Sequence, residues 1–292
     1  MLSRVELQGG ALLQDLEQAP ARGLGWRLLA TPTFTVGALI VSFWVLAALA
    51  TSVFPLVNPL GVDPVHTLAP PSPGHWLGTD DLGRDVLARV LAGSASVLSI
   101  APAATLLGLA GGVTLGLVSG YYRGFADDLL MRGADILMSL PVVITAVVAL
   151  ALLGSSEVNV ILVIGFLFTP FVARTVRSAV LPEREREYVE AARLRGEKGP
   201  FVMAAEILPN VRAPIIVEAT LRLGYAAFAA STLSFLRLGV QPPSPDWGLT
   251  IALEQPYIQI APWTVLFPAL ALASLVVGVN LVADGLSKVL AA

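Results

Sequence analysis

The sequence predicts an all-α integral membrane protein with six transmembrane helices. Of its 292 residues, 55% are hydrophobic and only 13% are charged, whereas a soluble domain carries roughly a quarter charged residues. The mean hydropathy is +0.77. Several uncharged runs also reach the length of about 20 apolar residues that a helix needs to cross the hydrocarbon layer. These observations place the chain in the lipid bilayer.

Six apolar segments are expected to span the membrane. They are the uncharged runs 34–54, 90–122, 136–156, 158–173 and 258–283, and an apolar run at 223–236 that becomes long enough if its helix begins near Pro214. This extension places Glu218 and Arg222 four residues apart, with the acid first, which is the favourable order for an ion pair within a helix. The run 158–173 is short for a span.

The N-terminal region is expected to be a cytoplasmic segment, 1–31, followed by the first transmembrane helix, 32–54. The alternative is a cleaved signal peptide, since "ALA" at 48–50 resembles a cleavage site. The polar stretch before the apolar run is too long for a signal peptide, and so is the run itself. We therefore prefer an uncleaved span.

The distribution of basic residues sets the orientation. With six spans, both termini lie on the same side of the membrane. Only three of the 18 Lys and Arg residues, Arg84, Arg89 and Arg237, fall in the segments on the other side. Because Lys and Arg concentrate in cytoplasmic loops, both termini and the charged segment 180–212 are expected in the cytoplasm.

The first external loop, 55–91, is rich in proline and is expected to be stiff and extended at first. A helix at the membrane interface is then expected from Thr79, because Thr is a good N-cap and Asp80 and Asp81 suit the positive end of a helix dipole. A cation site formed by Asp80, Asp81 and Asp85 is the alternative. Acids without a converging pattern are usually solvated.

Four glycines recur every fourth residue inside "GLAGGVTLGLVSG", and they are predicted to let another helix approach closely. They are Gly108, Gly112, Gly116 and Gly120. A nucleotide-binding loop would require Gly-Lys-Ser/Thr. Neither lysine of the chain follows a glycine, so the chain contains no Walker A motif.

The chain offers few residues for catalysis, metal binding or nucleic-acid binding. It has no cysteine, and its two histidines, His66 and His75, carry no further ligand signature. Two such histidines are more often ordinary loop residues than metal ligands. The net charge is −3, and the basic residues are not interleaved with aromatic ones as in nucleic-acid-binding proteins. We expect no catalytic residue, no metal site, no cofactor in the chain itself and no nucleic-acid partner.

The segment "EYVEAARLRGEKGPFVMAAEILPN" at 187–210 stands out because it is charged and lies between apolar runs. Acids come first and Arg193 and Arg195 come last, an order that matches a helix dipole. Pro182 fits the first turn of this helix, and Gly196 fits its left-handed C′ position.

A second short helix is expected from Pro200 to Pro209, which gives a helix–turn–helix on the cytoplasmic face. The first helix has a face of small and apolar residues, formed by Tyr188, Ala191 and Ala192, with Arg195 one turn on. Such a face is shaped to lie in the groove of a partner protein. The alternative is a helix resting on lipid headgroups, which the acid-rich first half disfavours.

This segment resembles the EAA loop of ATP-binding-cassette (ABC) importer permeases. The residues that match in order and spacing are Glu190, Ala191, Ala192, Gly196, Ile207, Leu208, Pro209 and Asn210. Three further motifs resemble the C-type permease subunit of dipeptide, oligopeptide and nickel importers: "HWLGTDDLGRDVLARVLAG" (75–93), "SFLRLGVQPPSPDWG" (234–248) and "APW…N…DGL" (261–286).

The resemblance implies the type I ABC importer permease fold, with a five-helix core domain at 92–290 that includes the EAA loop, 180–212. It implies a bacterial inner-membrane complex of this chain with a second, related permease, two cytoplasmic ATPases that bind ATP and Mg, and an external solute-binding protein. The implied ATPase-coupling residues are Glu187, Tyr188, Glu190, Ala191, Ala192, Arg195, Gly196, Leu208 and Pro209. A di- or oligopeptide is the expected solute, and a nickel chelate is the alternative.

The chain departs from the family pattern in two regions. Ala204, Ala205 and Glu206 stand where bulky and basic residues are usual, and Ala230 and Arg237 stand where Glu and Gly are common. Two other classes of function remain as alternatives. An ion-coupled secondary transporter would need acids inside its spans and inverted repeats, and a membrane scaffold would need no transport path.

Overall fold

The computed structural model of the protein describes residues 24–53 and 58–291, and every regular element in these ranges is a helix. After the short α2 (Leu24–Leu29), five of the described helices are long and apolar enough to cross a membrane: α3 (Pro32–Val53), α4 (Val86–Tyr122), α7 (Glu157–Glu183), α11 (Arg212–Phe235) and α13 (Trp263–Ala291). The predicted all-α membrane class is confirmed. Residues 1–23, which make up most of the expected cytoplasmic segment 1–31, lie outside the described residues.

The span predicted at 136–156 is not one continuous helix. This region contains α5 (Gly124–Ser139) and α6 (Val142–Leu153), whose axes differ by 90°. The helix breaks at Leu140, which is extended with φ −91° and ψ 136°. Pro141 causes the break, because a proline pushes the preceding residue out of the helical region. If the bent pair counts as one span, the described residues contain six.

Helix α7 is longer than the apolar run 158–173 from which it was predicted. It continues to Glu183 and includes Arg174 and Arg177. Both arginines are paired with acids of α5: Arg177 donates to both carboxylate oxygens of Asp127 at 2.5 and 2.6 Å, and Arg174 donates to Asp135. These pairs allow the charged end of α7 to remain helical and packed.

The helix expected from Thr79 begins instead at Val86. Its N-cap is Asp85, whose carboxylate accepts a hydrogen bond from the Ala88 N–H at 2.8 Å. Thr79 is occupied elsewhere, since its hydroxyl accepts a hydrogen bond from the Ala69 N–H at 2.8 Å and donates to the His66 carbonyl. The described part of the region before α4, residues 58–85, is therefore a loop tied to itself and contains no separate interfacial helix.

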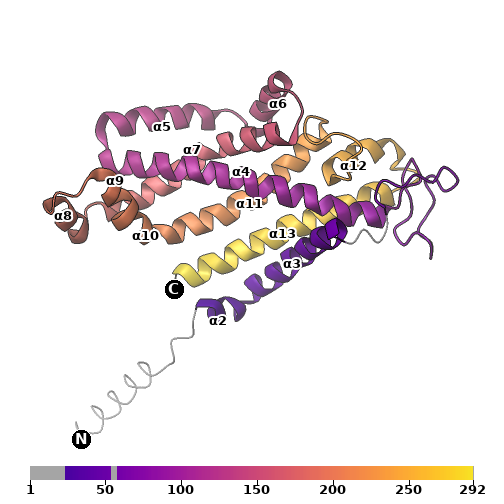
Figure 1. Cartoon of the computed structure of the whole chain (residues 1–292), viewed down its shortest axis with the longest axis horizontal. Helices are drawn as coiled ribbons and strands as arrows, with labels where there is room; N and C mark the ends of the chain where they lie inside the picture. Colours follow the sequence, from indigo (N-terminus) through magenta and orange to yellow (C-terminus); the bar gives the residue numbers. More distant parts are fainter. Residues whose placement is uncertain (1–23, 54–57, 292) are drawn as a thin grey trace, which may run out of the picture.

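The four-residue glycine repeat lies along the contact between α4 and α7, which run beside each other in Figure 1. A Cβ added at Gly112, Gly116 or Gly120 would come within 2.8 Å of Val172, Val176 or Val180, respectively. At Gly108 it would meet the Gly165 carbonyl at 3.0 Å. The missing side chains let the two helices approach closely, which is the packing typical of membrane helices.

Helix α11 begins at Arg212, close to the predicted Pro214, and contains the predicted ion pair. Arg222 Nε donates to Glu218 Oε1 at 2.6 Å, and Thr175 of α7 donates to the other carboxylate oxygen at 3.2 Å. The Arg222 guanidinium also lies 4.9 Å from the centre of the Phe171 ring. These partners compensate two charges held among apolar helices.

The end of the bundle that lies opposite the segment 180–212 is closed by α12 (Trp247–Glu254) and a 3-10 turn, Gln255–Tyr257 (Figure 1). This turn precedes α13, which is why α13 begins at Trp263 rather than at 258 as predicted. Trp247 is fully buried and donates its indole N–H to the Val90 carbonyl at 2.8 Å. It also packs edge-on against Trp44 of α3, with 4.8 Å between the two ring centres. These contacts join α3, α4 and α12.

Candidate functional site

The EAA loop is a chain of short helices between α7 and α11. It contains α8 (Glu187–Leu194), α9 (Gly199–Phe201), a π-helical turn (Val202–Ile207) and α10 (Leu208–Asn210). The helix–turn–helix is therefore present, but Pro182 does not open its first helix. Pro182 belongs to the last turn of α7, where the missing N–H removes only one hydrogen bond.

Gly196 ends the first helix as predicted. Its φ is +80°, in the left-handed region. Its N–H donates to the Arg193 carbonyl at 3.0 Å, and the Glu197 N–H donates to the Ala192 carbonyl at 3.2 Å. These are the two hydrogen bonds of a Schellman motif, which satisfies the free carbonyls at a helix C-terminus. The turn after α8 is thus fixed by the backbone.

The inner face of α8 anchors it to the bundle. Val189 and Ala192 are fully buried and pack with Val180 of α7 and Val211, which precedes α11. The prediction that Ala191 and Ala192 share one outer face is wrong: consecutive residues of an α-helix point about 100° apart, and Ala191 is exposed while Ala192 faces inward. Of these two alanines, Ala191 is the one that another surface can approach closely.

Tyr188 joins three elements of the loop. Its hydroxyl donates to Glu183 Oε1 of α7 at 2.7 Å and accepts from Asn210 Nδ2 of α10 at 3.2 Å. Burial and the hydrogen bond to Glu183 raise the pKa of Tyr188 to about 12, so the phenol stays neutral. The Asn210 amide also donates to the Glu206 carbonyl at 2.7 Å. The two helical arms of the EAA loop are therefore fastened to each other.

Two arginines connect the loop further. Arg195 Nη2 lies 3.2 Å from Glu206 Oε1, so the acid that departs from the family pattern has a partner within this chain. The Arg193 guanidinium lies 4.9 Å from the centre of the Tyr121 ring at the end of α4. The electrostatics of this surface thus differ from a pattern with a basic residue at position 206.

The remaining predicted coupling residues fall into two groups. Tyr188 and Leu208 are half-buried. The exposed residues are Glu187, Glu190, Ala191, Arg195, Gly196 and Pro209. Two further exposed residues of this loop are not among the predicted coupling residues: Leu194, which is 83% exposed, and Phe201, which is 49% exposed. In the sequence both residues can be recognised by their position, since they are apolar and flank the charged turn "RGEKGP".

The departures near the end of α11 have different environments. Ala230 is buried. Arg237 is exposed and takes the left-handed conformation, with φ +60°. Its N–H donates to the Ser234 carbonyl and the Leu238 N–H donates to the Leu233 carbonyl, both at 2.9 Å, so an arginine occupies a Schellman C′ position that favours glycine.

Comparison with known families and proteins agrees with this architecture. The pattern of the family described as binding-protein-dependent transport system inner membrane component matches residues 112–292. The chain is 39% identical over 255 residues to the dipeptide transport system permease protein DppC of Alkalihalophilus pseudofirmus, covering 87% of this chain and 84% of that protein. It is 38% identical over 220 residues to the glutathione transport system permease protein GsiD of Pectobacterium atrosepticum, covering 75% and 73%.

Among solved structures, an inward-facing form of the MetNI methionine ABC transporter is similar to this chain. The TM-score is 0.56, with 19% identity, and the match covers 70% of this chain and 96% of that one. At this identity the likeness concerns the fold.

Proposed function

This chain belongs to the family of binding-protein-dependent transport system inner membrane components, and from that premise we propose that its EAA loop couples ATP hydrolysis by a partner protein to the import of a di- or oligopeptide. The chain is a permease subunit of an ABC importer. The names of its relatives support a peptide as the solute, since dipeptide and di/tripeptide permeases are among them.

As a permease of this family, the chain is a multi-pass membrane protein that works with partner subunits. We infer that these partners are a second, related permease, two ATPases that bind ATP and Mg, and an external binding protein that delivers the solute. We also infer that both termini and the EAA loop face the cytoplasm, which the distribution of Lys and Arg supports.

The observation that carries the coupling role is the two-sided character of α8. Its inner face is buried against α7, the π-helical turn and the start of α11, and Tyr188 adds polar ties to both neighbouring arms. Its outer face leaves Glu190, Ala191 and Leu194 exposed. A helix anchored in this way can pass the movement of a bound partner to α7 and α11.

The size of the required effect explains why the anchoring must be firm. Shifting a two-state equilibrium from 1:99 to 99:1 takes about 5.5 kcal/mol of differential binding. A loosely attached helix would spend part of that free energy on its own rearrangement. In this chain α8 contacts the ends of several helices, so the work done on α8 reaches the transmembrane helices.

Adjacent alanines provide a direct test, because the chain contains no cysteine. Ala191→Cys places a thiol on the outer face of α8, and Ala192→Cys places one on the buried face. In the assembled transporter we expect Ala191→Cys to cross-link to the ATPase and Ala192→Cys not to do so. Equal cross-linking of the two variants, or cross-linking of neither with an exposed Leu194→Cys also unreactive, would contradict docking on this face.

The solute requires a separate experiment. We expect the transporter, reconstituted with its binding protein, to hydrolyse ATP faster when a di- or oligopeptide is added. Stimulation by a nickel chelate and not by peptides would replace the proposed solute and leave the coupling role intact. Uptake that continues without ATP as long as a proton gradient is present would contradict the coupling role itself.

A further inference from the structure

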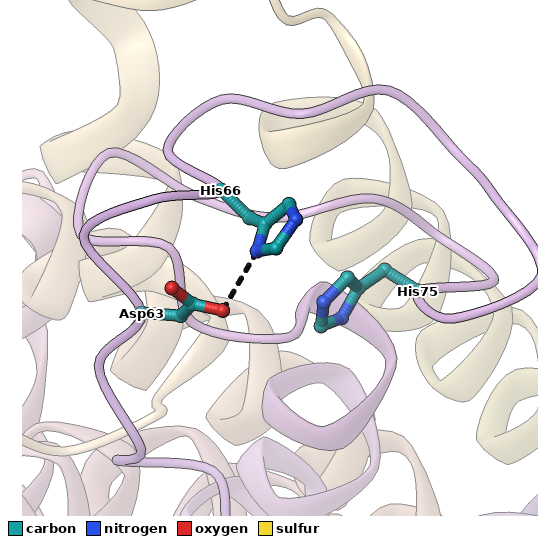
Figure 2. Close-up of side chains that lie close together, drawn as sticks. All are labelled: Asp63, His66 and His75. Atoms are coloured by element: carbon teal, nitrogen blue, oxygen red, sulfur yellow. Dashed lines mark hydrogen bonds and ion pairs between the residues drawn. The ribbon is translucent and has the colours of Figure 1, made fainter.

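The loop before α4 brings together three side chains with metal-binding chemistry, which Figure 2 shows. His66 Nδ1 lies 2.8 Å from Asp63 Oδ2, and the His75 ring faces this pair. One nitrogen or oxygen atom of each residue lies within 4.8 Å of those of the other two. Both histidines are expected from the sequence to be ordinary loop residues, because nothing in it marks Asp63 as a third ligand.

The backbone of the loop holds these side chains in place. Asp63 Oδ1 accepts from the Val65 N–H at 3.0 Å, and the His66 N–H donates to the Asp63 carbonyl at 3.1 Å. These bonds form a turn that sets His66 beside Asp63. His75 is fixed by a separate turn, in which Ser72 and His75 exchange two backbone hydrogen bonds of 2.9 and 3.0 Å. The cluster is thus built on two closed turns.

His75 is oriented by a fourth residue. Its Nδ1 lies 2.9 Å from Asp85 Oδ2, and Asp85 is in turn fixed as the N-cap of α4. A carboxylate at this distance favours the hydrogen on Nδ1, which leaves the lone pair of Nε2 free. A histidine held by a carboxylate in this way is the usual arrangement of a metal-binding histidine.

The charge of the cluster also suits a cation. The Asp63 carboxylate supplies a negatively charged oxygen ligand beside the two imidazoles. The side chains of Asp63 and His66 are 43% and 55% exposed, and that of His75 is 28% exposed. Water can therefore reach the cluster and complete the coordination of an ion.

We propose that Asp63, His66 and His75 bind a divalent transition-metal ion such as Zn²⁺, with Asp85 as a positioning residue for His75. Two imidazoles and one carboxylate are ligands that suit Zn²⁺, Ni²⁺ or Cu²⁺, whereas Ca²⁺ and Mg²⁺ prefer oxygen ligands alone. Three protein ligands and an open position for water form a known type of zinc site. The bound ion links the turn at Asp63 to the turn at His75, and so fastens the loop to the start of α4.

The test measures Zn²⁺ binding to the full chain, purified in lipid nanodiscs without a polyhistidine tag. Because the chain has only two histidines, competition with a zinc indicator reports on this cluster. We expect one ion per chain and at least tenfold weaker binding in His66→Gln and in His75→Gln. Asp85→Asn, which keeps an N-cap residue, should weaken binding by about 10–100-fold. The matched control Asp128→Asn changes an exposed aspartate elsewhere and should leave binding unchanged.

A second readout covers the case in which a variant fails to fold. Wild-type protein loaded with Co²⁺ should show the visible absorption of a nitrogen- and oxygen-coordinated ion, and this absorption should disappear when a chelator removes the ion. Three outcomes would overturn the proposal. These are an absence of saturable Zn²⁺ binding, unchanged binding in the double variant His66→Gln/His75→Gln, and equal affinity for Ca²⁺.

Discussion

The two ends of the helical bundle use charged residues in opposite ways. Figure 1 shows α8 at one end and α12 at the other. At the α8 end, most of the charged residues of the EAA loop are exposed. The α12 end, formed by residues 58–89 and 237–257, buries ionisable residues among apolar ones: Asp80, Arg84, Arg89, Asp246 and Glu254. One end therefore leaves its charges exposed, and the other uses them to hold its own loops together.

The buried charges at the α12 end are largely compensated within the chain. Asp80 accepts from Arg84 Nε at 2.6 Å and from two backbone N–H groups, those of Leu82 and Arg84, at 3.0 and 2.8 Å. Arg89 donates to the Thr250 hydroxyl at 3.1 Å, which links α4 to α12. Buried charges are tolerated when they are paired in this way, so this end is expected to be rigid.

The largest expected effect concerns two glycines at the ends of different helices. Gly196 after α8 and Gly154 after α6 have φ values of +80° and +89°, and each donates its N–H to a backbone carbonyl. Proline cannot adopt this φ and has no N–H, which costs about 3 kcal/mol or more. We expect Gly196→Pro to reduce ATP-driven uptake by at least about 100-fold while the protein remains in the membrane.

The matched variant Gly154→Pro should suffer a similar local strain and retain most of its uptake per folded molecule, because it does not touch the EAA loop. Uptake is measured in proteoliposomes and normalised to the amount of folded transporter. Equal losses in the two variants would show that the effect is general destabilisation and would remove the special role of α8.

The next effect compares an ion pair from each end. The side chains of Arg84 and Asp80 are 8% and 1% exposed, whereas those of Arg195 and Glu206 are 56% and 28% exposed. Breaking a buried pair costs about 3–5 kcal/mol, and an exposed pair contributes about 0–1 kcal/mol. Arg84→Met should therefore lower the thermal unfolding midpoint in detergent clearly, and Arg195→Met should barely change it. Similar shifts for both variants would break the comparison.

Glu254 makes stability at the α12 end depend on pH. Burial raises the pKa of Glu254 to about 8, and nearby Asp81 and Asp80 add to the effect; neither carboxylate oxygen has a hydrogen-bond partner among the described residues. Because the folded state holds this proton more tightly than the unfolded state, stability should fall as the pH rises from about 4.5 to about 8.

Glu254→Gln, which is neutral at every pH, should flatten this dependence. At pH 8 we expect it to be more stable than wild type, because the amide carries no charge that must be desolvated, and near pH 4.5 the two proteins should unfold at similar temperatures. A wild-type stability that rises over this interval would contradict the assignment. The measurement is thermal unfolding across the pH series.

The smallest effect is a gain in stability at Arg237. This residue holds a left-handed conformation with φ +60°, which costs about 1–2 kcal/mol for residues other than glycine. Arg237→Gly should therefore raise the unfolding free energy by about 1 kcal/mol. Ser244→Gly, which changes a loop residue without a positive φ, should not stabilise the protein.

Local patterns predicted much of the fold and part of the candidate site. The hydropathy of the apolar runs placed α3, α4 and α11 to within about four residues, and the position of Gly196 after Arg195 predicted the end of α8. Helix α13 begins five residues later and ends eight residues later than the predicted run 258–283. The extent of α7 was underestimated, because Arg174 and Arg177 find acidic partners on α5. The break at Pro141 was overlooked because hydropathy alone does not register a proline.

Composition and spacing along the chain were enough to predict the membrane class, the order of the apolar helices and the segment that carries exposed charges. Three other features became visible in the folded protein: Ala192 faces inward while Ala191 does not, Glu206 pairs with Arg195, and Asp63 lies beside two histidines. The physical reason is the same in each case. Burial and pairing depend on how separate helices and turns pack together, and that packing brings together residues that no local pattern relates.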